Sequence, residues 1–139
     1  MLTKVSSADL ASVVSKYNAV AVYLFGSQVD GGADAMSDVD IGVIFGDQEI
    51  SLDDLLFLQD DLQRLFGPAP VDLVLLEKAA ITVAYKAISQ GELIYSQCDQ
   101  SRTDFEERVI RSYQDFAPFL SMFYREVKEE LMGSDQLDR

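Results

Sequence analysis

Residues 20–45 read VAVYLFGSQVDGGADAMSDVDIGVIF and predict two strands that meet a glycine-serine turn and a pair of acids at one end. The apolar run 20–25 is β-prone and stops abruptly at Gly26-Ser27, as a buried strand does where it enters a tight turn. Backbone N–H groups at such a turn favour phosphate oxygens, and glycine lets the backbone approach a ligand closely. Ser27 adds a hydroxyl donor. Gly26 and Ser27 are therefore candidate nucleotide-binding residues.

Two acids open the second expected strand, residues 38–45. Asp38 and Asp40 are two residues apart, so on a strand their side chains point to the same face. Two like charges side by side are unfavourable unless a cation lies between them, and Mg²⁺ is typically held by one or two carboxylates together with substrate phosphates. Asp38 and Asp40 are therefore candidate metal ligands.

A third acid, Asp72, lies in the apolar run 70–76. An unpaired charge inside such a strand is costly, so we expect a metal or a proton-donating substrate hydroxyl beside it, with a backbone donor or an arginine as the alternative. With Asp38 and Asp40 it would complete a centre in which two metal ions roughly 3.5–4 Å apart clamp the attacking and leaving oxygens. We assign Asp72 to the second metal and to activation of the nucleophile.

Composition limits the chemistry that the chain can perform. The 139 residues contain no histidine, which removes the usual general base and zinc ligand and leaves carboxylates for acid–base work. The formal charge of −13 repels phosphate backbones and disfavours a nucleic-acid partner, so a protein or small-molecule acceptor fits better. Gly26 and Gly31 have the glycine spacing of a P-loop, but Gly32-Ala33 follows where lysine and serine or threonine are needed.

Length and patterning predict a single domain over residues 1–139, with 48% apolar residues to build its core. A single cysteine, Cys98, indicates a reducing compartment, and no stretch is apolar enough to be a leader or a membrane span. We therefore expect a soluble, cytoplasmic protein with no membrane partner.

The periodicity predicts an α+β fold, in which a small mixed sheet is flanked by helices and has the acids at one edge. Helices are expected from residue 7, from residue 51 to about 67, from about 78 to 89, and from about 103 onward; a further strand is expected at 93–95. In the last helix an amphipathic stripe is expected to pack mainly on the sheet, and Pro118 should kink the helix. The stripe comprises Phe105, Val109, Tyr113, Phe116, Leu120, Phe123, Val127 and Leu131. Phe119 and Tyr124 lie off it and suggest an interface to a partner or a second copy.

The spacing of Gly26-Ser27, ten residues and Asp38-Val39-Asp40, followed by Val71-Asp72-Leu73, resembles that of the DNA polymerase β superfamily of nucleotidyltransferases, in the short form called minimal nucleotidyltransferases. Residues 91–95 (GELIY) resemble the family's strand after its fourth helix. Residues 111–120 (RSYQDFAPFL) resemble the helix that closes the antitoxin members, the MntA-type antitoxins of HEPN–MNT toxin–antitoxin pairs.

The resemblance implies a specific activity, the transfer of AMP from ATP onto a tyrosine of a cognate HEPN ribonuclease toxin, with release of pyrophosphate. It implies that Gly26 and Ser27 bind the triphosphate, and that Asp38, Asp40 and Asp72 hold two Mg²⁺ ions. It also implies a hetero-oligomer with the toxin, and it leaves a homodimer open.

The chain departs from the family pattern just after Ser27, where Gln28-Val29-Asp30 stands in place of arginines. Lys78 or Lys86 could supply the missing positive charge, and the sequence does not choose between them. Two alternative functions therefore stay open. One is a binding-only antitoxin that neutralises its partner by occlusion, and the other is a small-molecule nucleotidyltransferase of the aminoglycoside type, although the C-terminal substrate domain of that type is missing.

Overall fold

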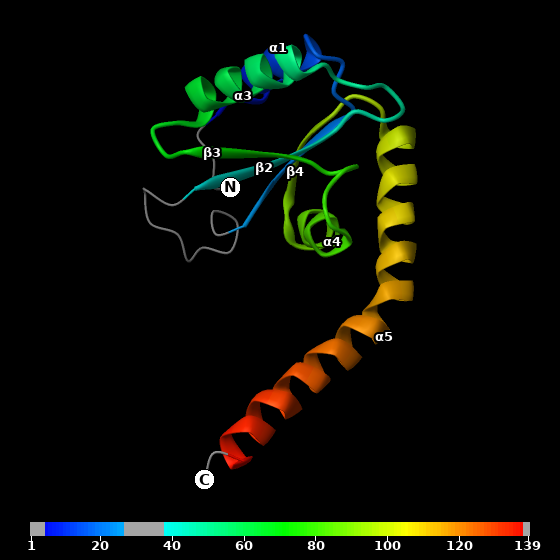
Figure 1. Cartoon of the computed structure of the whole chain (residues 1–139). Helices are drawn as coiled ribbons and strands as arrows, with labels where there is room; N and C mark the ends of the chain where they lie inside the picture. Colours follow the sequence, from blue (N-terminus) through cyan, green and yellow to red (C-terminus); the bar gives the residue numbers. More distant parts are fainter. Residues whose placement is uncertain (1–4, 27–37, 138–139) are drawn as a thin grey trace.

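A four-stranded mixed sheet forms the centre of the computed structural model, with strand order β3-β2-β1-β4 (Figure 1). The structure describes residues 5–26 and 38–137, with side chains up to residue 132. Strand β1 pairs antiparallel with β2 and β4, whereas β2 and β3 are parallel. The elements are α1 (Ser7–Ser15), β1 (Ala21–Phe25), β2 (Val39–Ile44), α3 (Leu52–Phe66), β3 (Val71–Leu75), α4 (Ile81–Gln90), β4 (Glu92–Ser96) and α5 (Asp99–Leu137). The expected α+β fold with a long C-terminal helix is confirmed.

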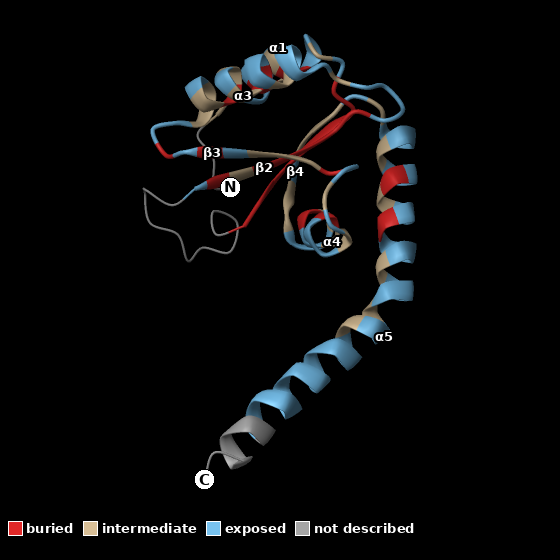
Figure 2. Cartoon of the chain, in the orientation of Figure 1, coloured by how far each residue is buried: buried red, intermediate tan, exposed pale blue. Residues whose placement is uncertain are grey.

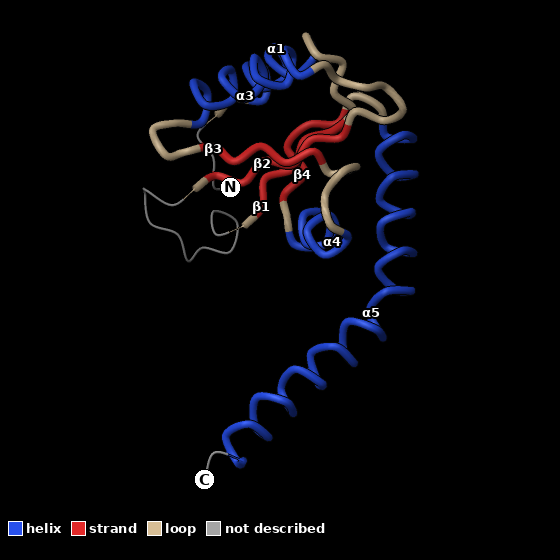
Figure 3. The backbone as a smooth tube through the Cα atoms, viewed as in Figure 1, coloured by secondary structure: helices blue, strands red, loops and turns tan. Residues whose placement is uncertain are grey.

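Helices cover both faces of the sheet, and a separate apolar cluster fills each interface (Figure 3). Successive strand residues point to opposite faces, so Val22 and Leu24 of β1 pack towards α1 and α3, while Tyr23 and Phe25 pack towards α4 and α5. This explains why β1 is apolar throughout, with all five residues buried. The two faces can therefore be treated separately when the acids are placed.

Serine side chains begin two of the helices. The Ser6 hydroxyl accepts a hydrogen bond from the N–H of Asp9 at 3.0 Å, and the Ser51 hydroxyl accepts one from Asp54 at 3.1 Å. Each bond satisfies a backbone donor that has no partner within its helix. The capped start expected at residue 51 is confirmed.

Helix α4 begins at Ile81, three residues after the expected start. The residues before it form a turn, in which the Glu77 carboxylate accepts hydrogen bonds from the N–H groups of Phe45 and Gly46 at 2.8 and 2.7 Å. Glu77 thus ties this turn to the end of β2. These long-range bonds compete with helix formation, and the local sequence does not reveal them.

Helix α5 contains 39 residues and begins at Asp99, four residues earlier than expected. Arg102 holds its first turns to the sheet through hydrogen bonds to the Ser96 hydroxyl at 3.1 Å and to Glu106 at 3.1 Å. The buried Tyr23 hydroxyl of β1 also donates to Glu106, at 2.6 Å. A polar network therefore anchors the start of this helix.

The apolar stripe of α5 divides between Tyr113 and Phe116 into a packed part and an exposed part. Phe105 and Val109 are buried, and the ring of Tyr113 stacks on Tyr85 of α4 with 3.8 Å between centroids. Beyond Tyr113 the expectation that the stripe packs mainly on the sheet is wrong, because the helix runs away from the body and exposes its apolar residues (Figure 2). Pro118 is accommodated inside the helix, and Figure 1 shows the expected change of direction in this region.

Candidate active site

Strand pairing brings two of the three predicted acids together. Antiparallel pairing of β1 and β2 places Phe25 opposite Asp40, and parallel pairing of β2 and β3 places Asp40 beside Asp72. The end of β1, which leads into Gly26, and the starts of β2 and β3 therefore meet at one end of the sheet. Asp38 lies one residue before β2, at the same end.

Both carboxylates of this pair lie on the face of the sheet that α4 and α5 cover. Asp40 shares its side of β2 with Ile44, which belongs to the cluster under α4 and α5, and Asp72 shares its side of β3 with Val74, which packs against that cluster. Asp40 is half-buried, whereas Asp38 and Asp72 are exposed. The assumption that Asp72 is buried within an apolar strand is therefore wrong. The distinctive feature of its surroundings is the neighbouring carboxyl group of Asp40.

The electrostatics of Asp40 reflect this crowding. Partial burial raises the pKa of Asp40, and the negative charges of Asp72 and Asp38 raise it further, as does a hydrogen bond with the Asp72 side chain. Each cause disfavours the charged form of Asp40. A cation held between these carboxylates would remove the penalty, so the pair has the donor chemistry that a magnesium ion requires.

Lys86 of α4 acts in the opposite direction. Its positive charge lowers the pKa of Asp40 and so partly offsets the rise caused by burial and by the charges of Asp72 and Asp38. Of the two lysines that the sequence left open, the structure therefore favours Lys86 as the cation at this site. The choice depends on how α4 is turned on the sheet, which local sequence does not encode.

Gly26 provides a place where no side chain fits. Its φ is +82°, a left-handed conformation, and a Cβ atom added there would overlap the carboxylate of Asp40. The backbone at Gly26 thus lies directly against the Asp40 side chain. This contact supports the grouping of Gly26 with Asp40 in one site. Ser27, together with the residues 28–30 that depart from the family pattern, lies outside the described residues.

The donor set fits a metal in chemistry, but it does not form a closed cage. Over residues 5–26 and 38–132, whose side chains the structure describes, no three acidic or thiol side chains are arranged so that they could hold a metal ion by themselves. Since Mg²⁺ usually takes one or two carboxylates and completes its shell with phosphates and water, Asp40 and Asp72 suffice as protein ligands, with Asp38 beside them. Such an open arrangement suits a metal that arrives with a nucleotide.

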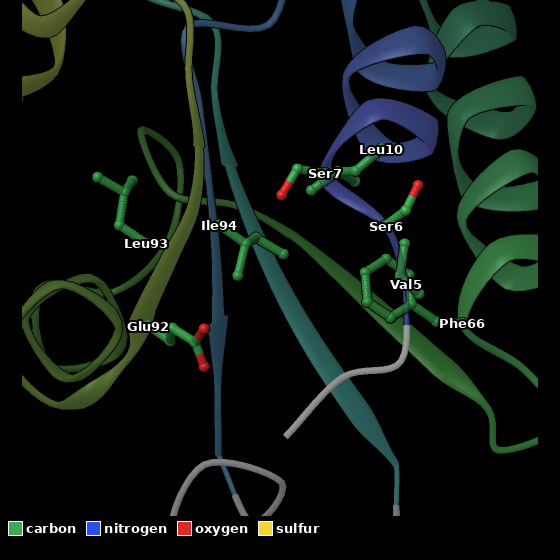
Figure 4. A pocket seen from close by; sticks show the side chains of 8 residues that line it. All are labelled: Val5, Ser6, Ser7, Leu10, Phe66, Glu92, Leu93 and Ile94. Carbon is green, nitrogen blue, oxygen red and sulfur yellow. The ribbon is translucent and has the colours of Figure 1, made fainter. Parts of the chain in front are cut away.

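A hollow lies on the opposite face of the sheet from the acid pair, between α1, β4 and the end of α3 (Figure 4). Its volume is about 130 Å³, and it is lined by Val5, Ser6, Ser7, Leu10, Phe66, Glu92, Leu93 and Ile94. Leu10, Phe66 and Ile94 belong to the cluster under α1 and α3, so the sheet separates this hollow from the acid pair. It is not part of the candidate active site.

A glycine turn against paired carboxylates, at one end of a mixed sheet, is an arrangement suited to metal-assisted transfer of a phosphate-containing group. Residues 8–100 match the family model described as polymerase beta, nucleotidyltransferase. The chain belongs to this nucleotidyltransferase family, and the resemblance found in the sequence is confirmed at that level. No curated protein sequence matches the chain.

Several solved structures share the fold over most of the chain. A toxin–antitoxin complex with AMP-PNP has a TM-score of 0.72 and 21% sequence identity, covering 88% of this chain and 98% of that one. The toxin–antitoxin MntA-HepT has a TM-score of 0.67 and 20% identity, covering 88% and 96%. A tri-AMPylated HEPN toxin from Shewanella oneidensis in complex with MNT antitoxin has a TM-score of 0.68 and 20% identity, covering 88% and 95%. At these identities the similarity establishes the fold.

In the part of the chain that the structure describes, no helix combines the length and the hydrophobicity needed to cross a membrane.

Proposed function

We propose that this protein is an antitoxin that transfers AMP from ATP onto a tyrosine of a cognate HEPN toxin and thereby neutralises it. The observation that carries the proposal is that Asp40 lies beside Asp72 and against Gly26, in a chain of the nucleotidyltransferase family. The similar structures add support, since one is a toxin–antitoxin complex with AMP-PNP and another contains an AMPylated toxin bound to its antitoxin. A cytoplasmic site of action fits both ATP and an intracellular toxin.

In the proposed reaction the tyrosine hydroxyl oxygen attacks the α-phosphorus of ATP. The bond between the α-phosphorus and the bridging oxygen to the β-phosphate breaks, and pyrophosphate leaves with that oxygen. Asp72, which is exposed at the edge of the pair, accepts the tyrosine proton. The product is a phosphodiester between AMP and the tyrosine, so atoms and charge balance without a further reactant.

Each remaining residue has a role that its position allows. Asp38, Asp40 and Asp72 would hold the two Mg²⁺ ions, which when bound neutralise phosphate charge and orient the leaving group. The backbone at Gly26, and Ser27 after it, would contact the triphosphate. Lys86 would supply positive charge near the phosphates in place of the arginines missing after Ser27.

A transfer assay with ATP labelled at the α-phosphate, carried out in lysate of the source cells with Mg²⁺, tests the proposal. Wild type should label one protein, and Asp38→Asn/Asp40→Asn should label none although its unfolding midpoint is no lower than that of wild type. Asp47→Asn/Glu49→Gln is a matched control, because it removes the same charge from exposed positions beyond the other end of β2. The control should label as wild type does.

The outcome that contradicts the proposal is equally definite. If wild type labels no protein while the toxin is present and still neutralised, the chain is a binding-only antitoxin. The sequence Gln28-Val29-Asp30, which lacks the family's arginines, favours that second function.

A further inference from the structure

Residues 116–132 of α5, called here the α5 extension, form a helical surface that the rest of the described chain leaves uncovered (Figure 2). Its large apolar side chains are exposed by between 36% and 67%: Phe116, Phe119, Met122, Phe123, Tyr124, Val127, Leu131 and Met132. On an isolated helix in water such residues gain nothing from their apolar character, because no surface is buried. The extension therefore requires a partner surface.

The exposed apolar area is large enough for a stable complex. A buried aromatic side chain removes about 150–250 Å² from water, so the four partly exposed aromatic residues of the extension offer on the order of 450 Å². The largest apolar patch on a typical monomer is roughly 300–600 Å², and a standard interface buries about 800 Å² on each partner. With the four aliphatic residues added, the extension approaches the interface value.

Charge disfavours a second copy as the occupant. The extension itself is nearly balanced, with Arg125 and Lys128 against Glu126, Glu129 and Glu130, but the whole chain carries −13. Like-charge repulsion opposes the association of two such chains, whereas a basic partner would be attracted. The complementary surface is therefore an apolar groove bordered by basic side chains, the usual receptor for an amphipathic helix.

The extension also continues from the side of the molecule that carries the candidate active site. The packed part of α5 contributes Phe105 and Val109 to the cluster beneath the face of Asp40 and Asp72. After the bend near Pro118, the extension runs away from the sheet on the side covered by α4, opposite α1 and α3 (Figure 1). A protein seated on the extension consequently lies on the same side of the sheet as the acid pair.

We propose that the α5 extension is a docking surface for the acceptor protein, which it holds through an apolar groove bordered by basic side chains while the acceptor tyrosine reaches the acids. This inference rests on the proposed function. It separates acceptor binding, carried by the extension, from chemistry, carried by Asp40 and Asp72, and it therefore predicts that the two can be disrupted independently.

The test compares two double variants of the full chain, each of which removes two large apolar side chains of similar fractional exposure. Phe119→Ser/Phe123→Ser removes side chains exposed by 67% and 57% from the extension, and Leu52→Ser/Phe57→Ser removes side chains exposed by 70% and 61% from α3. The probe is the protein labelled from α-labelled ATP in the wild-type assay above. The extension variant should raise the KM for this acceptor at least tenfold, because aromatic anchors at an interface are worth more than about 1.4 kcal/mol, with kcat little changed. The α3 variant should match wild type.

The other outcomes each overturn a defined statement. If the acceptor is labelled and the extension variant shows wild-type KM, the docking inference is wrong while the proposed function stands. If sedimentation of the chain alone shows a dimer that only the extension variant dissociates, the occupant is a second copy. If wild type labels no protein, the proposed function fails, and the docking inference fails with it. Asp40→Asn, which should still bind the acceptor, separates lost binding from lost chemistry.

Discussion

Replacing Gly26 with alanine should reduce stability and transfer activity together. Gly26 has a φ of +82°, and a left-handed conformation costs a residue with a side chain about 1–2 kcal/mol. The new Cβ would also overlap the Asp40 carboxylate, and forcing that side chain off its rotamer adds about 0.5–1.5 kcal/mol. We expect the free energy of unfolding to fall by about 1.5–3.5 kcal/mol, of which about 0.5–1.5 kcal/mol comes from the contact with Asp40.

Gly46→Ala is the matched control, because Gly46 also has a positive φ, +71°, but lies beyond the other end of β2. An added Cβ there would have Val20 as its nearest neighbour at 3.4 Å, an ordinary contact, so only the conformational cost of about 1–2 kcal/mol applies. Urea denaturation of both variants gives the difference. The α-labelled ATP assay should show a loss of transfer for Gly26→Ala alone.

A double variant isolates the contact between the glycine turn and the acid. If the overlap is the cause, Gly26→Ala should cost less stability in an Asp40→Ala background than in wild type, a coupling of about 0.5–1.5 kcal/mol. Equal stabilities for Gly26→Ala and Gly46→Ala, with transfer retained in both, would show that the turn does not press against Asp40 and that the site is assembled differently.

Three further predictions concern the acid pair and the two parts of α5. Burial and the negative charges of its neighbours raise the pKa of Asp40 in the folded state, so folding favours its protonated form. The contribution of Asp40 to stability is therefore fully present below the unfolded pKa of 3.8 and is lost as the pH rises through the folded pKa. Asp40→Asn should therefore gain stability relative to wild type as the pH rises above about 4 in metal-free buffer, and a constant difference across that range would contradict the assignment. Tyr23→Phe removes the hydroxyl that donates from β1 to Glu106 and should lower the free energy of unfolding by about 1–3 kcal/mol in urea denaturation; an unchanged stability would argue against that hydrogen bond. Phe105→Ala should lower the free energy of unfolding of the isolated chain by about 3–5 kcal/mol, because the side chain is buried. Phe119→Ala should lower it by almost nothing, because that side chain is 67% exposed. Comparable losses of stability would mean that the extension is packed.

The fold was largely predictable because its strands and helices have strong periodic patterns. The strand expected at residues 38–45 and the capped start at Ser51 depend on neighbours close in sequence, and both expectations are confirmed. The start of α5 was misplaced because its first turn is polar and is held by Ser96 and Glu106 rather than by apolar packing. The start of α4 was misplaced because Glu77 bonds to a strand distant in sequence.

The candidate site was predicted as a list of residues, but its physical basis was not. The spacing of Asp38 and Asp40 follows from strand geometry, and their role as metal ligands stays a prediction. Asp72 was selected on the assumption that it is buried, whereas the structure exposes it and gives it Asp40 as a neighbour. Selection of Lys86 over Lys78 required the orientation of α4 against the sheet.

The sequence by itself determined the order of the elements, the apolar faces of the strands and the spacing of the glycine turn and the first two acids, because these depend on residues only a few positions apart. Tertiary structure decided that Asp72 lies beside Asp40, that Lys86 acts on Asp40, and that the α5 stripe is packed as far as Tyr113 and exposed from Phe116 onward. The physical reason is that periodicity defines which face of an element is apolar, whereas strand pairing and helix direction decide what that face meets.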